Sequence, residues 1–174
     1  MAAPDLDITL HELGDCALQW GTDKLGSTGE NTSLTVEDEV SETKCTQLGS
    51  TPTKRYIVGR RCEVEVSLAE PDLRRVGIVL NTTQTTGSGT NYVLIQTPIG
   101  GQELTAKELI IRKYVDNLVS GDEADSIHIF QATLSSAVEL GFGPDAQRML
   151  KCLFVALPDP NNGMALGYFG DKTA

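Results

Sequence analysis

Residues 34–68 read LTVEDEVSETKCTQLGSTPTKRYIVGRRCEVEVSL, and apolar and polar residues alternate through much of this stretch. An apolar residue at every second position is typical of a β-strand with one buried face. Over residues 34–43, Leu34, Val36 and Val40 fall on one face, while the other face is acidic. We therefore predict a half-buried strand here, with Asp38 as the one charged residue on its apolar side.

A second alternating segment covers residues 54–68, where Cys62, Val64, Val66 and Leu68 face one way. Gly59 in its middle predicts a bulge or bend, because glycine inside a strand pattern often marks one. Gly49 and Pro52 between the two segments are turn-forming residues. Residues 34–68 are therefore predicted to form one long hairpin with a projecting tip.

The composition bounds the size and class of the protein. A chain of 174 residues favours a single domain, 1–174. The formal net charge of -10 disfavours a protein that grips nucleic acid through its phosphates. Four cysteines without a C-x-x-C pair, and two histidines outside ligand spacing, give no metal site, so no cofactor is expected. The sequence has neither a signal-like leader nor an apolar run long enough to span a bilayer, so no membrane insertion is expected.

The rest of the chain also favours strands. A short helix is predicted over 71–80, with Pro71 at its first position, and the polar stretch 81–91 is predicted to be a flexible loop. Further strands are expected at four places, namely 92–97, 104–114 (which also fits a helix), 126–140 and 148–157. About eight strands and one helix predict a mainly β fold, a sandwich or barrel with one flanking helix and a long projecting hairpin.

No motif in the sequence argues for catalysis. There is no G-x-S-x-G elbow, phosphate loop or H-E-x-x-H zinc motif. Ser41 and Lys44 match S-x-x-K, but on a strand this spacing does not bring the two side chains together. Asp122, Glu123 and Asp125 lack the spacing of an EF-hand and are interpreted as a solvated turn. The protein is therefore not expected to be an enzyme.

Four blocks in order along the chain carry a resemblance. They are LGDCALQWG (13–21), LGSTPTKRYIVGRRCEVEVSLAEPDL (48–73), IFQATLSSAVELGF (129–142) and RMLKCLFVALPDPNNGMALGYFGD (148–171). Together they resemble the tail tube proteins, or major tail proteins, of tailed bacteriophages. Asp38 and the stretch 81–91 depart from that pattern.

The resemblance implies a structural virion protein with the phage tail tube fold and an extended N-terminal arm over about residues 1–12. Such a protein assembles in the host cytoplasm into hexameric rings that stack into the hollow tail tube, through which DNA passes during ejection without specific binding. Its implied partners are other copies of itself, the tape-measure protein, the tail terminator, and baseplate or tip proteins. A sheath would be a further partner if the tail contracts.

Two groups of residues follow as candidate sites. The acidic faces of the hairpin are predicted to line the channel, and Arg61 to pair with a glutamate across the hairpin; the channel-lining set is Glu37, Glu39, Glu63 and Glu65. The hairpin tip is predicted to contact a neighbouring subunit or ring through Gly49, Ser50, Thr51, Pro52, Thr53, Lys54 and Arg55.

Three alternatives stay open. The same fold serves the tubes of contractile injection systems and type VI-like secretion systems, which charge alone does not distinguish. A carboxylate-based hydrolase on a small β-scaffold would need a pocket with two perturbed carboxylates. A monomeric binding module would stay monomeric at high concentration.

Overall fold

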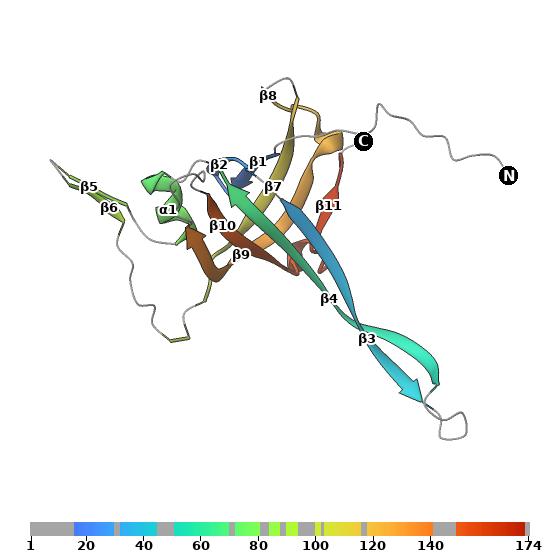
Figure 1. Cartoon of the computed structure of the whole chain (residues 1–174). Helices are drawn as coiled ribbons and strands as arrows, with labels where there is room; N and C mark the ends of the chain where they lie inside the picture. Colours follow the sequence, from blue (N-terminus) through green and yellow to red (C-terminus); the bar gives the residue numbers. More distant parts are fainter. Residues whose placement is uncertain are drawn as a thin grey trace.

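Most of the strands form one curved antiparallel sheet, with a short helix at one end and a long hairpin projecting from the other (Figure 1). The computed structural model describes residues 16–29, 32–44, 51–69, 72–80, 84–87, 90–93, 100–101, 103–115, 118–140 and 149–172. The predicted N-terminal arm, about residues 1–12, lies outside this part of the chain.

Almost every secondary-structure element of the described chain is a β-strand. The strands are β1 (Cys16–Trp20), β2 (Asp23–Ser27), β3 (Ser33–Lys44), β4 (Pro52–Leu68), β5 (Gln84–Gly87), β6 (Thr90–Val93), β7 (Ala106–Val115), β8 (Leu118–Val119), β9 (Ile127–Leu140), β10 (Leu150–Leu157) and β11 (Gly167–Phe169). The helices are α1 (Leu73–Val79) and the single 3-10 turns η3 (Glu123–Asp125) and η4 (Pro160–Asn162).

The main sheet has the strand order β2-β1-β7-β9-β10-β4-β3, with β11 paired to β9 and β8 to β7. The sheet curls until the end of β2 meets the end of β4, where Thr28 bridges Leu68 and the Gly29 N–H donates to the Ser67 carbonyl at 2.6 Å. The prediction of a mainly β chain with one flanking α-helix is confirmed. In place of a sandwich of two sheets, the structure has one open sheet that curls toward closure.

The core lies on the concave side of this sheet. Trp20 and Phe154, both almost fully buried, meet edge to face with their ring centroids 5.8 Å apart. The Trp20 indole Nε1–H donates to the carbonyl of Ala132 at 3.0 Å, so its one polar atom is satisfied inside the core. Core residues come from the strands on both sides of this pair, among them Leu18, Leu25, Val64, Val66, Leu68, Leu109, Ile129, Leu150 and Cys152.

The predicted strand at 126–140 is present as β9, but its faces change partway along. His128, Phe130, Ala132 and Leu134 were expected on one face, and this was wrong. Lys107 of β7 is paired with Ala132 and Leu109 with Ile129, so β9 has one extra residue at this point. The bulge brings Ile129 onto the core side with Ala132 and leaves His128 on the opposite face.

Two other predictions need correction. The helix α1 begins at Leu73, after Asp72, whose carboxylate caps it by accepting the Arg75 N–H at 2.7 Å, so the predicted start at residue 71 was two residues too early. The stretch 81–91 is not a loop throughout, since β5 and β6 pair in a separate two-stranded sheet. Its polarity suggested a loop, whereas the β-branched threonines that it contains favour a strand.

Replacing Phe154 by alanine is expected to lower the free energy of unfolding by about 3 to 5 kcal/mol, because a fully buried ring leaves a cavity against Trp20. Leu153 is its neighbour on β10 and is only half-buried, so Leu153→Ala is the matched control and should cost less. Urea denaturation of both variants measures the difference. Equal losses would contradict the placement of the core on the Phe154 side of β10.

Candidate assembly surfaces

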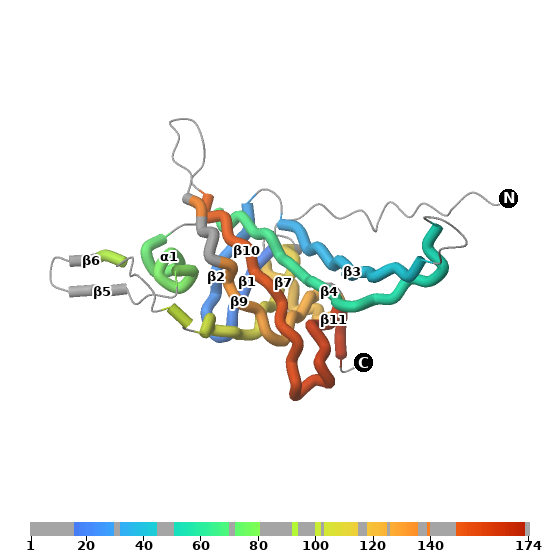
Figure 2. Tube along the Cα trace, turned by 90° about the horizontal axis from the view of Figure 1, so that it is seen from below, coloured from blue at the N-terminus to red at the C-terminus, as the bar shows by residue number. Residues whose placement is uncertain are grey.

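The hairpin of β3 and β4 has a base within the core and an outer half that leaves the body of the protein. At the base, Leu34 pairs with Val64, which is fully buried. Further along the same face, Val36 is 49% exposed and Val40 is 38% exposed. The predicted strand is therefore present, but its apolar side is buried only at the base. The outer half extends beyond the sheet, with α1 at the opposite end of the molecule (Figure 2).

A bulge separates the two halves of the hairpin, as Gly59 predicted. Glu39 pairs with Gly59 and the next residue, Val40, pairs with Ile57, so Val58 is the extra residue of β4. A bulge of this kind bends and twists the strand that carries it. The bulge lies where the hairpin leaves the core.

Oppositely charged residues face each other across the hairpin on both sides of the bulge. The Arg60 guanidinium donates twice to the Asp38 carboxylate, at 2.5 and 3.0 Å, and Arg55 forms an ion pair with Glu42 at 3.1 Å. The hydrogen bond from Arg60 holds the pKa of Asp38 below its ordinary value. Asp38 interrupted the apolar pattern of its strand, and the reason is that it lies beyond the core, opposite a cation.

The four glutamates predicted to line a channel share one face of the hairpin. Glu65 pairs with Ser33, Glu63 with Thr35, and Glu39 with Gly59, while Glu37 is opposite Arg61. Directly paired residues of antiparallel strands project to the same side, so the register brings all four together. Glu63 is half-buried and the other three are exposed. That this face lines a channel stays a prediction.

Arg61 forms its ion pair with Glu63 of its own strand. The prediction that it pairs with a glutamate across the hairpin was therefore wrong. Residues two apart on a strand point to the same face, so a long arginine side chain reaches along the strand as easily as across it. One of the four carboxylates is thus compensated.

The part of the predicted contact tip that the structure describes is Thr51–Arg55, and all five residues are exposed. Gly49 and Ser50 lie outside the described residues. The Thr53 hydroxyl donates to the carbonyl of Thr43 at 3.0 Å and holds the two strand ends together. Whether the tip contacts another subunit stays a prediction.

Sequence reasoning missed a run of three exposed apolar residues next to the tip. Tyr56, Ile57 and Val58 are 51%, 64% and 60% exposed. Three consecutive exposed apolar residues on a soluble surface indicate a contact to another molecule. The signal was visible in the sequence, because YIV breaks the alternation of this strand.

A groove of about 510 Å³ lies between the inner face of this hairpin and the C-terminal segment. Its floor includes Ile127 and Ile129, and its rim carries the exposed side chains of Val36, Met164 and Phe169. The groove could not be predicted from the sequence, since its lining comes from β3, β4, β9, β11 and the segment between β10 and β11.

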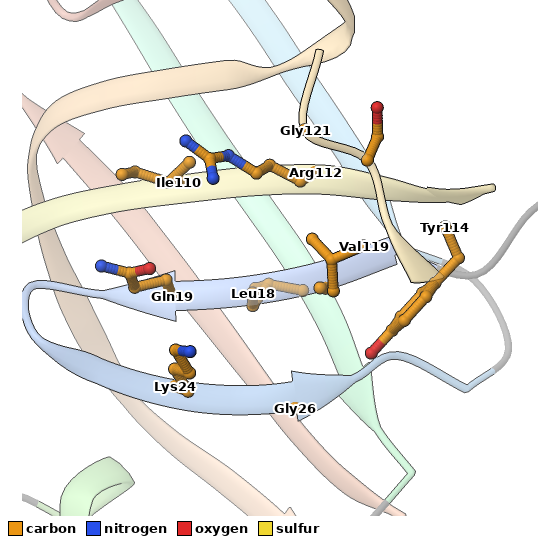
Figure 3. Close-up of a pocket in the computed structure, with 11 residues that line it drawn as sticks. Leu18, Gln19, Lys24, Gly26, Ile110, Arg112, Tyr114, Val119 and Gly121 are labelled. Atoms are coloured by element: carbon orange, nitrogen blue, oxygen red, sulfur yellow. The ribbon is translucent and has the colours of Figure 1, made fainter. Parts of the chain in front are cut away.

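A second cavity, of about 330 Å³, lies over β1, β2 and β7, where β8 folds back (Figure 3). Lys24, Gln19 and Arg112 line it together with apolar side chains. Neither this cavity nor the groove is lined by an aspartate or a glutamate. These two cavities therefore do not supply the pair of carboxylates that the hydrolase alternative requires.

A buried histidine near the start of β9, His128, contacts two carboxylates. His128 contacts Glu108 through Nδ1 at 3.3 Å and Glu123 through Nε2 at 3.1 Å, and its ring stacks on Tyr168 with centroids 4.7 Å apart. Burial, followed by the charges of Glu108, Glu123 and Asp171, raises the pKa of Tyr168. Glu123 also pairs with Arg112. The acidic turn noted in the sequence is thus tied into the fold through Glu123.

Cys62 and Cys152 are buried and free, and burial raises the pKa of the Cys152 thiol to about 12. Within the described residues, no helix has the length and apolar character needed to cross a membrane. Comparison of the sequence with models of known protein families gives no match, and comparison with curated proteins gives none either.

The pair of Asp38 and Arg60 makes a prediction about pH. Because the folded pKa of Asp38 is lowered, its pair is complete above the ordinary value of 3.8 and is lost only as the pH falls through the lower folded value. A titration of the Asp38 carboxyl carbon by NMR should have its midpoint below 3.8, and Arg60→Gln should raise that midpoint. Arg55→Gln, which removes the partner of Glu42, is the control and should leave it unchanged. An unshifted midpoint in Arg60→Gln would refute the pairing.

Proposed function

We propose that this protein is a structural subunit that assembles into hexameric rings, which stack into the hollow tail tube of a tailed bacteriophage. The observation that carries the proposal is the outer half of the β3–β4 hairpin, which has no packing partner among the described residues of its own chain. The resemblance of four sequence blocks, in order, to tail tube proteins supports it from the side of the sequence.

A projecting two-stranded hairpin is costly for a monomer. Two strands without a third strand or a packed face are at best marginally stable in water. Here the outer half carries the exposed apolar side chains of Ile57 and Val58 as well. Contact with a neighbouring subunit would bury these side chains and give the hairpin the partner that it lacks.

The last strand of the main sheet offers a second reason for assembly. β3 ends the strand order, so along its twelve residues it is paired on one side only, to β4, among the strands that the structure describes. A long free edge invites pairing with another chain unless it is covered. In the proposed ring, the strands of neighbouring subunits continue one another around the channel and remove these edges.

The acidic face of the hairpin suits a channel that DNA passes through. Glu37, Glu39 and Glu65 are exposed on one face, in a chain of net charge -10. A protein binds DNA phosphates through cationic side chains, which displace the counterions of the DNA. An anionic wall makes no such contacts and therefore does not hold DNA. In this proposal the location is the virion tail. The tape-measure, terminator and baseplate or tip proteins are further partners.

Electron microscopy of the purified chain tests the function. We expect rings with six-fold symmetry, and stacks of such rings as the concentration rises. Particles that remain featureless monomers at all concentrations would refute the proposal. The source of the rings distinguishes the two kinds of tube. Rings found in virions that contain DNA would indicate a phage tail tube, whereas rings found in a secretion apparatus would indicate the related tube of an injection system.

The position of the acidic face gives a second test, on assembled tubes. Glu37→Cys and Glu65→Cys, in a chain whose Cys16 and Cys45 are serine, should react with a bulky polymer-linked maleimide only before assembly. A small reagent such as iodoacetamide should react in both states, because a channel is filled with water whereas a packed interface is not. Modification of assembled tubes by the bulky reagent would place this face on the outer wall.

A further inference from the structure

The groove beside β11 is built to receive an apolar segment. Its floor reaches the core at Ile129 and Cys62, which are 3% and 6% exposed, while Met164 and Phe169 on its rim are 65% and 67% exposed. A monomer gains nothing from holding large apolar side chains in water around an open groove. The groove therefore has the character of one half of an interface.

The other half of such an interface is on the same chain. Tyr56, Ile57 and Val58 form a short apolar run on the projecting hairpin, at the bulge that turns the strand. The hairpin is itself one wall of the groove, through Val36 and Arg60, and it points away from the body (Figure 1). Its apolar run therefore has no route into its own groove, but it can enter the groove of a second copy.

We propose that the hairpin of one subunit inserts its Tyr56–Val58 run into the groove between β3 and β11 of the next subunit. This inference rests on the proposed function and names the contact that joins its subunits. A patch that binds a different patch on the next copy makes a head-to-tail contact, which closes into a ring or continues as a filament. An assembling subunit needs a contact of this kind.

Charge complementarity favours the same partner. Residues 44–61 contain five basic residues and no acidic one, and Lys44 and Lys54 at the tip pair with no carboxylate in the described part of the chain. Tyr168, which lines the groove, lies close to Glu108, Glu123 and Asp171. A strand rises about 3.3 Å per residue, so an inserted Ile57 leaves Lys54 about 10 Å away. In the proposed contact the basic tip lies on the side of Tyr168, next to these three carboxylates.

Two charged substitutions separate the halves of this contact. Ile57→Glu places a charge on the apolar run of the hairpin, and Phe169→Glu places one at the rim of the groove. Both positions are more than 60% exposed, so both variants should keep the circular dichroism spectrum and the melting temperature of the parent chain. Each variant alone should fail to form rings or tubes. A 1:1 mixture should form a dimer and stop there, because it retains one intact hairpin and one intact groove. Sedimentation velocity measures the mass of the species.

Leu118→Glu is the matched control, since Leu118 is 73% exposed on β8, away from the hairpin and the groove, and this variant should assemble like the parent chain. Two results would overturn the proposal, namely assembly of both single variants, or a mixture that stays monomeric at concentrations where the parent chain assembles. In either case, rings from the parent chain would leave the ring-forming function standing. A parent chain that never assembles refutes that function and this contact together.

Discussion

The antiparallel ladder between β3 and β4 is the contact on which the other features of this structure depend. At its base it places Leu34 and Val64 in the core, and further out it places Asp38 opposite Arg60. A shift of one residue in either strand would exchange the faces and turn carboxylates toward the core. Burial at the base therefore fixes the register, and the register then determines what each face of the outer half presents.

The outer half of the ladder is stabilised by interactions that are weak one at a time. Exposed ion pairs such as that of Arg55 with Glu42 contribute little in water. The hydrophobic effect works against this half in a monomer, since Ile57 and Val58 stay exposed. β4 has seventeen residues and extends well beyond the core, so under the proposed function the stability of the hairpin would depend in part on contacts in the assembly.

The sequence predicted those elements whose pattern is long and regular. The hairpin, its bulge at Gly59 and the common face of the four glutamates all follow from the period of two. The five-residue strands β1 and β2 were not predicted, because segments so short give little periodicity. The change of face in β9 depends on one extra residue, which no local pattern reveals. The groove could not be predicted for a different reason: its walls include Val36 and Phe169, which are more than 130 residues apart in the sequence.

The alternation of side chains along a strand lets one hairpin serve two purposes. On one face, Glu63 pairs with Arg61, whereas Glu37, Glu39 and Glu65 form no ion pair within the part of the chain that the structure describes. On the other face, Val36 borders the groove and Ile57 is exposed. If the second face is covered by a neighbouring subunit, the first is left facing the space that the subunits enclose. Thus the contact that would build the ring would also determine which charged side chains line its interior. The interior could then be strongly anionic even if the net charge of -10 is spread unevenly over the surface of the subunit.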